Sequence, residues 1–273
     1  MSAPIDGLSR VCTALAATGL PLIGGWSHLP GGFVAEVLGT ADFDWCCVDR
    51  QHGLIDEADM FDMVRVLDLC GTPPVVRVSN SDTYEIGRAL DAGAHGVIVP
   101  VVRGVADAQR AADACRFAPE GTRSWATTRS KLHSQKLEAN VANQRVACIV
   151  MIETVEALEA LEEIAGLPDV DGLFFGAGDL GLVLAGEGAS VDDAAKSVVD
   201  CCSRHRKIAG VFAGGSDRVP EWLRQGFELV AVEADSMLLM QAARAAVESA
   251  RAAAERRQSP VVLPPRSVTE GTK

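Results

Sequence analysis

A repeat is the feature that most constrains the fold of this 273-residue chain: eight apolar runs, each followed by a segment with helical periodicity. The runs are centred near residues 22, 46, 75, 97, 149, 173, 210 and 230. Strands that alternate with helices form parallel sheets, because two parallel neighbours need a crossover connection between them. Eight such units in a chain of this length predict an α/β fold, a (β/α)8 TIM barrel, with an open doubly wound sheet as the alternative.

The repeat also sets the expected domain organisation. We predict one barrel domain over residues 1–258, which ends in a long alanine-rich helix over about 237–257, and a disordered tail over 259–273, which contains three prolines. A short helix is expected at the N-terminus. The arginine-containing stretch 116–130 is expected to be an ordered loop, since loops of that length are usually functional or disordered. Residues 181–190 are expected to form a glycine-rich loop.

Charge and cysteine content exclude several classes of partner. The net charge is −12 and the sequence pI is near 4.9, so a nucleic-acid partner is not expected, because phosphate binding needs a basic surface. No apolar run approaches the length of about 18 residues that a membrane span needs, and no signal peptide is recognisable. The eight cysteines include no C-x-x-C pair. We therefore expect a reduced, cytoplasmic protein that acts on small molecules.

Two acidic residues follow neighbouring apolar runs. The run 148–152 stops at Glu153, and the run 170–175 leads through Gly176-Ala177-Gly178 to Asp179. If both runs are parallel strands, both carboxylates emerge at the same edge of the sheet. Oxygen ligands side by side suit Mg²⁺ or Mn²⁺ better than zinc. The alternative is that each acid only stabilises the start of a helix.

Three further polar groups stand at strand ends. Asp49 and His52 follow the second run, and Arg77 closes the third. In a TIM barrel these positions lie on the catalytic face, beside Glu153 and Asp179. His52 can serve as a general base, and the planar Arg77 guanidinium suits a carboxylate ligand, with an ion pair to Asp49 as the alternative.

The stretch Gly176-Ala177-Gly178-Asp179-Leu180-Gly181 matches the dinucleotide pattern G-x-G-x-x-G. We reject a nucleotide site because the acid would repel a pyrophosphate and the following residues do not look helical. The glycines are instead expected to let backbone amides approach a small anion beside the metal.

At these residues the chain resembles the HpcH/HpaI aldolases over about residues 20–255. The family's strand-end pattern with aspartate and histidine appears as Asp49-Arg50-Gln51-His52, and its Val-Val-Arg appears as residues 75–77. Its two metal-binding acids match Glu153 in Ile152-Glu153-Thr154 and Asp179 in Gly178-Asp179-Leu180. The acid that pairs with the catalytic histidine falls at Asp91.

The resemblance implies a class II pyruvate aldolase that reversibly cleaves a 4-hydroxy-2-oxo acid to pyruvate and an aldehyde through a metal-stabilised enolate. It implies that Glu153 and Asp179 hold Mg²⁺ or Mn²⁺, with Co²⁺ as a further candidate. His52, oriented by Asp91, would remove the 4-hydroxyl proton, while Arg77 binds the 2-oxo acid together with Asp49, Gly176 and Gly178. It also implies a homo-oligomer, a hexamer built as a trimer of dimers, in which the last helix is exchanged between subunits.

Three departures from the family pattern bear on specificity. Gln51 replaces a glutamate, Met151 replaces a glutamine, and the usual Gly-Pro-Ala-Asp-Leu-Ser reads Gly-Ala-Gly-Asp-Leu-Gly. Two rival functions follow. One is a synthase similar to macrophomate synthase, which decarboxylates oxaloacetate and adds the enolate to another electrophile. The other is a barrel that has lost catalysis and serves as a binding or assembly subunit.

Overall fold

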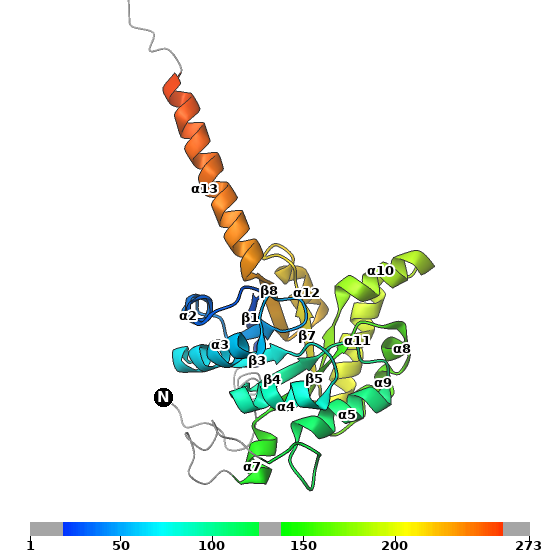
Figure 1. Ribbon diagram of the computed structural model, residues 1–273. Helices are drawn as coiled ribbons and strands as arrows, with labels where there is room; N and C mark the ends of the chain where they lie inside the picture. The colour runs from blue at the N-terminus through cyan, green and yellow to red at the C-terminus, as the bar shows by residue number, and fades with distance from the viewer. Residues whose placement is uncertain (1–18, 126–137, 259–273) are drawn as a thin grey trace, which may run out of the picture. The chain divides into compact units, whose positions relative to one another are not determined.

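The computed structural model describes residues 19–125 and 138–258, and in it eight parallel strands close into a barrel in chain order (Figure 1). The predicted TIM barrel is therefore confirmed, and the open sheet is wrong. The strands are β1 (Leu22–Ser27), β2 (Trp45–Asp49), β3 (Pro74–Arg77), β4 (Gly96–Val99), β5 (Ala147–Ile152), β6 (Gly172–Phe175), β7 (Ile208–Phe212) and β8 (Leu229–Ala234).

One or more helices follow each strand, and Figure 1 shows this alternation. They are α2 (Gly32–Gly39), α3 (Glu57–Cys70), α4 (Thr83–Ala92), α5 (Val105–Cys115), α7 (Ala139–Gln144), α8 (Val155–Glu159), α9 (Leu161–Ala165), α10 (Ala177–Glu187), α11 (Val191–His205), α12 (Val219–Gln225) and α13 (Asp235–Gln258). The predicted N-terminal helix, the end of the 116–130 loop and the predicted disordered tail lie outside the described residues.

Side chains along each strand alternate between two apolar clusters, as the two-residue period of a strand requires. On β5, Ala147, Ile149 and Met151 belong to the smaller cluster, whereas Cys148, Val150 and Ile152 belong to the larger cluster. The larger cluster contains helix residues as well, so it is the layer between strands and helices, and the smaller one fills the barrel. Met151, a departure from the family pattern, is thus a core residue that is 4% exposed.

The barrel interior is filled by large side chains that need small neighbours. Trp45 is completely buried, and a Cβ atom on Gly24 of the adjacent strand would lie 2.2 Å from its ring. Trp26 packs against Phe174 and Phe212, with ring centroids 5.7 and 5.3 Å away. Interiors of barrels are packed cores in general, so the chemistry is left to the rim.

The strand register brings the predicted site residues to one rim. Asp49 is aligned with Arg77 across β2 and β3, and each is the last residue of its strand. Glu153 directly follows Ile152, which is aligned with Phe175 at the end of β6. The expected convergence at the C-terminal face is therefore present in the backbone.

One predicted loop is a helix. Residues 181–190 were expected to be irregular because of their glycines, but α10 runs through most of them and ends at Gly188, which has φ 71°. Leu180 and Leu184, one helical turn apart, are buried in the larger cluster, and this packing outweighs the low helix propensity of glycine. Asp179 consequently lies in the first turn of α10.

The chain divides into two compact units, Met1–Ser236, which holds the barrel, and Met237–Lys273, which holds most of α13. The predicted exchange of this helix between subunits stays a prediction. The cysteines of the described ranges are free thiols, all buried except Cys70. Among the described helices, none is both long and apolar enough to cross a bilayer.

Candidate active site at the barrel rim

Asp49 is the most densely bonded polar group of the rim. Its side chain is fully buried, and Oδ1 accepts hydrogen bonds from Arg77 Nε at 2.8 Å and from the backbone amides of Gln51 and His52 at 2.9 and 3.3 Å. Oδ2 accepts from Arg77 Nη2 at 2.5 Å and from Trp26 Nε1 at 3.1 Å, and it lies 3.1 Å from His28 Nε2. Both oxygens are saturated by protein groups.

These contacts keep Asp49 ionised. Burial by itself would raise the pKa of this carboxyl, but hydrogen bonds from His28, Arg77 and Trp26, together with the Arg77 charge, hold the pKa well below its usual range. Asp49 was predicted to bind substrate. Since its acceptor sites are already used, its contribution to a ligand site runs through Arg77.

Arg77 makes the bidentate ion pair with Asp49 that the sequence left open as an alternative. The guanidinium also lies over the ring of Trp26, 5.0 Å from its centroid. Its hydrogen bonds in the described structure use Nε and Nη2, so Nη1 can donate to an anion. The ion pair and an anion-binding role are therefore compatible, because the guanidinium carries five donors.

Glu153 occupies the same rim and is 5% exposed. Its Oε1 accepts a hydrogen bond from the backbone N–H of Val101 at 2.5 Å. Val101 has φ 57°, a backbone conformation that a β-branched residue rarely adopts. Such strain is common at functional sites. Here the strained backbone points the N–H of Val101 at the Glu153 carboxylate.

The pKa of Glu153 is raised, first by burial and then by the nearby charge of Asp179, while Arg77 and His52 act in the opposite direction. These four side chains are therefore within electrostatic reach of one another. Two acids, one of which has too little positive charge around it, form a site that a divalent cation would complete. The donors are oxygens, so the set fits Mg²⁺ or Mn²⁺.

Gly176, which follows β6, needs to be a glycine because Glu153, which follows β5, lies directly against it. A Cβ atom at this position would lie 2.4 Å from Glu153 Cβ, whereas one at Gly178 would meet nothing within 4 Å. We expect Gly176→Ala to lower the affinity for divalent metal at least about tenfold, because it would displace Glu153, which is predicted to be a ligand. Calorimetric metal titration checks this. Gly178→Ala is the matched control and should bind metal as the wild type does; equal affinities in both variants would contradict the prediction.

His52 and Asp91 are placed differently. His52 is exposed beside Gln51, whose buried Oε1 has no hydrogen-bond partner in the described structure. Asp91 lies on α4, where its Oδ1 accepts a hydrogen bond from Arg123 Nη2 at 2.9 Å. The contacts described within this chain do not join Asp91 to His52, so their pairing stays a prediction.

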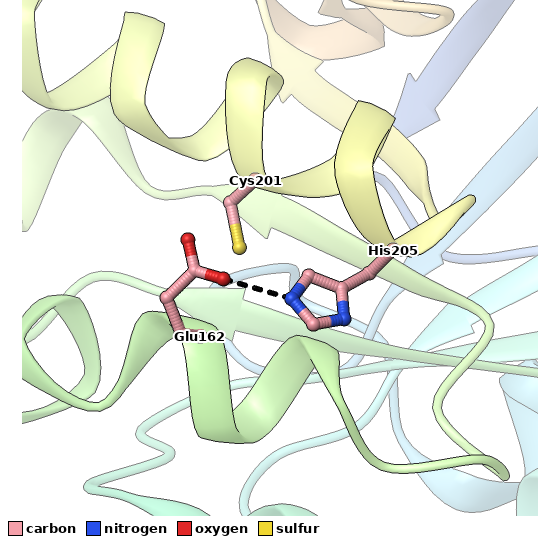
Figure 2. A group of neighbouring side chains, drawn as sticks. All are labelled: Glu162, Cys201 and His205. Carbon is pink, nitrogen blue, oxygen red and sulfur yellow. Dashed lines mark hydrogen bonds and ion pairs between the residues drawn. The ribbon is translucent and has the colours of Figure 1, made fainter.

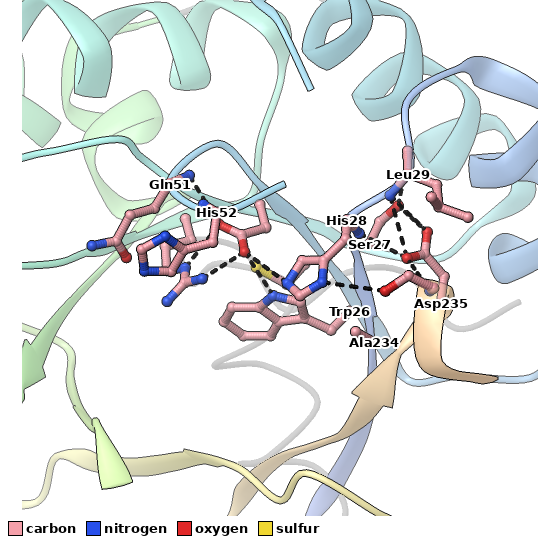
Figure 3. Close-up of polar contacts among 12 residues, drawn as sticks. Trp26, Ser27, His28, Leu29, Gln51, His52, Ala234 and Asp235 are labelled. Atoms are coloured by element: carbon pink, nitrogen blue, oxygen red, sulfur yellow. Dashed lines mark hydrogen bonds and ion pairs between the residues drawn. The ribbon is translucent and has the colours of Figure 1, made fainter. Parts of the chain in front are cut away.

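Sequence reasoning missed three groups of this rim: Trp26, His28 and Asp235. Figure 3 shows them together with His52. His28 directly follows β1 and Asp235 directly follows β8. The strand-end rule that selected Asp49 and Glu153 would have selected both, but neither stands in a recognisable motif.

A second cluster, Glu162, Cys201 and His205, lies on α9 and α11 (Figure 2). His205 Nε2 is 2.8 Å from a Glu162 oxygen, and Arg204 pairs with the same carboxylate. Burial raises the pKa of the Cys201 thiol to about 11. A neutral thiol and a carboxylate already paired with arginine make this an ion-pair cluster of the helical layer.

Comparison with known proteins agrees with this geometry. The family model HpcH/HpaI aldolase/citrate lyase matches residues 23–242. A hydroxypyruvate/pyruvate aldolase of Rhizorhabdus wittichii is 36% identical over 86% of this chain and 96% of its own length. The crystal structure of an HpcH/HpaI aldolase/citrate lyase family protein from Burkholderia cenocepacia has a TM-score of 0.74 at 31% identity, covering 85% of this chain and 95% of that one.

Macrophomate synthase shares the fold alone: its crystal structure has a TM-score of 0.77 at 24% identity, covering 92% of this chain and 90% of that one. The family match spans most of the barrel and includes each strand end described above. The chain is a lyase that belongs to the HpcH/HpaI aldolase/citrate lyase family.

Proposed function

We propose that this protein is a metal-dependent aldolase that reversibly cleaves a 4-hydroxy-2-oxo acid to an aldehyde and pyruvate or hydroxypyruvate. The observation that carries the proposal is the meeting of Arg77, His52 and Asp179 around the buried carboxylate of Glu153. The name of the Rhizorhabdus wittichii relative supports the choice of pyruvate and hydroxypyruvate as the 2-oxo acid products. The raised pKa of Glu153 supports a cation there, and Mg²⁺, Mn²⁺ or Co²⁺ are the candidates.

In the proposed site, Glu153 and Asp179 would hold the cation. When bound, it would supply Lewis acidity that lowers the energy of the enolate formed during cleavage. Arg77 Nη1 would donate to the carboxylate of the 2-oxo acid. The free amides at the start of α10, from Ala177 to Asp179, would face the same anion, since a helix N-terminus favours negative charge.

His52 is the proposed general base. It would take the proton of the 4-hydroxyl group, whose oxygen becomes the aldehyde carbonyl as the bond between C3 and C4 breaks. The electron pair of that bond passes to C3 and the 2-oxo group as an enolate, and a proton added at C3 gives pyruvate. For Asp91 to orient His52, the contact would have to come from a neighbouring subunit of the oligomer, because within one chain Asp91 lies near the end of α4, four residues before His95 at the other end of the barrel.

Assembly and location belong to the same proposal. We propose a cytoplasmic homo-oligomer, a hexamer formed as a trimer of dimers, in which α13 is exchanged. The apolar side chains of α13, among them Met237, Leu239 and Val247, support a helix that packs against a neighbouring subunit.

The test is the release of pyruvate or hydroxypyruvate from a panel of 4-hydroxy-2-oxo acids. We expect turnover that is abolished by a chelator and restored by Mg²⁺, Mn²⁺ or Co²⁺. Oxaloacetate is the second arm of the assay. Rapid oxaloacetate decarboxylation without cleavage of any hydroxy-oxo acid would favour the synthase, and no turnover in either arm would favour a binding subunit.

A further inference from the structure

We infer that His28 is a positioning residue of the 2-oxo acid site: it fixes the orientation of Asp49 and, through Asp49, that of Arg77. The inference rests on the proposed function for its ligand. Its physical basis is the geometry of the rim, where His28 Nε2 lies 3.1 Å from Asp49 Oδ2, the oxygen that also accepts from Arg77.

The tautomer of His28 follows from its two partners. The ionised carboxylate of Asp49 can only accept a hydrogen bond, so Nε2 of His28 carries a proton. On the other side of the ring, Nδ1 lies 3.5 Å from the hydroxyl oxygen of Ser236, which can donate to it. Both ring nitrogens are therefore used by the protein, so His28 is suited to holding Asp49 and not to accepting a substrate proton.

The backbone of His28 is fixed as firmly as its ring. Asp235 Oδ1 accepts from the His28 amide at 2.8 Å, and Asp235 Oδ2 accepts from the Ser27 hydroxyl at 2.8 Å. The Leu29 amide donates to the same carboxylate. The imidazole is thus held on a short rigid turn after β1, tied to the end of β8. Figure 3 shows this run of contacts from Asp235 through His28 towards the residues beside His52.

The position of Asp49 matters because its carboxylate holds the guanidinium of Arg77 in place. Its guanidinium is bound edge-on to Asp49 through two nitrogens and lies over Trp26, so any turn of the carboxylate moves Nη1 as well. Without His28, Oδ2 keeps Arg77 and Trp26 as donors, so the fold should survive. A small misplacement of a substrate-positioning group nevertheless costs much of its effect.

The experiment measures the affinity of the metal-loaded protein for pyruvate by calorimetry. We expect His28→Ala to weaken pyruvate binding about tenfold, because the shift of Asp49 misplaces the Arg77 guanidinium that binds the ligand. His28→Gln, which retains an N–H donor, should recover most of the affinity. The midpoint of thermal unfolding should change little in either variant, because the His28 side chain is 30% exposed.

His95→Ala is the matched control. His95 Nε2 also meets an aspartate, Asp68 at 3.4 Å, but it stands just before β4, at the other end of the barrel. Its removal should leave pyruvate affinity unchanged. Equal weakening in His95→Ala and His28→Ala, or no weakening in His28→Ala, would overturn the inference, because the effect would then be general or absent.

Two further measurements separate positioning from a purely structural role. The Nε2–H tautomer of His28 is expected in nitrogen-15 histidine spectra of the wild type, and an Nδ1–H tautomer would overturn the inference. His28→Ala and Arg77→Lys should be non-additive in pyruvate affinity, because both act through one guanidinium. Additive losses would show that His28 acts elsewhere. Failure of the proposed function would appear instead as absence of aldol cleavage in the wild type.

Discussion

Replacing Asp49 by asparagine is expected to lower the free energy of unfolding by about 3–5 kcal/mol, the usual cost of removing one partner of a buried ion pair. Asparagine keeps the size of the side chain but leaves the buried Arg77 charge without compensation. Urea or thermal unfolding of the metal-free protein measures the loss. Turnover should also fall, because Arg77 loses the group that orients it.

Acid titration tests the same residue. Folding lowers the pKa of Asp49, so this carboxylate stabilises the native state above the ordinary aspartate pKa of about 4 and loses that contribution as pH falls below it. The asparagine variant should lack this part of the pH dependence.

Asp62→Asn provides the control for the unfolding measurement, since Asp62 pairs with Arg65 at the exposed surface of α3. Exposed pairs contribute about 1 kcal/mol or less. If the two variants lose similar amounts of stability, the Asp49 pair is no stronger than a surface pair.

Glu153→Gln is expected to have the opposite effect on stability. Because burial and Asp179 raise the pKa of Glu153, the native state penalises its charge, so neutral glutamine should leave the metal-free protein equally stable or more stable near neutral pH. Glutamine Oε1 can still accept from Val101. Metal affinity and turnover should nevertheless fall by more than about 100-fold, beyond the loss that a group outside the ligand set usually causes.

Unfolding and metal titration are measured on the same preparation of Glu153→Gln. Glu156→Gln is the control, because Glu156 is an exposed acid three residues further on, in the first turn of α8. It should retain metal affinity and turnover. A Glu153→Gln variant that binds metal normally would remove Glu153 from the proposed ligand set.

The barrel could be predicted because each element leaves a periodic trace in the sequence. Buried parallel strands read as apolar runs, and a polar residue at the end of a run falls on the catalytic rim, which located Asp49, Arg77 and Glu153. The helix α10 was missed because its stability comes from the burial of Leu180 and Leu184 and not from its glycine-rich composition.

Pairings across the fold are harder to predict. His28 and Asp235 are 207 residues apart, and no local pattern links them. Likewise, the contact of Asp91 with Arg123 depends on how α4 meets the segment after α5, which is set by packing. Sequence position alone therefore indicated which residues reach the rim and one possible pair, Asp49 with Arg77, but not the contact of His28 with Asp235 or that of Asp91 with Arg123.

The hydrogen bonds from Ser27 and His28 to Asp235 set the point in synthesis at which the site can be completed. β1 is made first and β8 last, and the carboxylate that holds Ser27 and His28 comes only after the eighth strand. The turn after β1 that supports Asp49 and Arg77 therefore lacks its Asp235 contacts until the last strand of the barrel has been made.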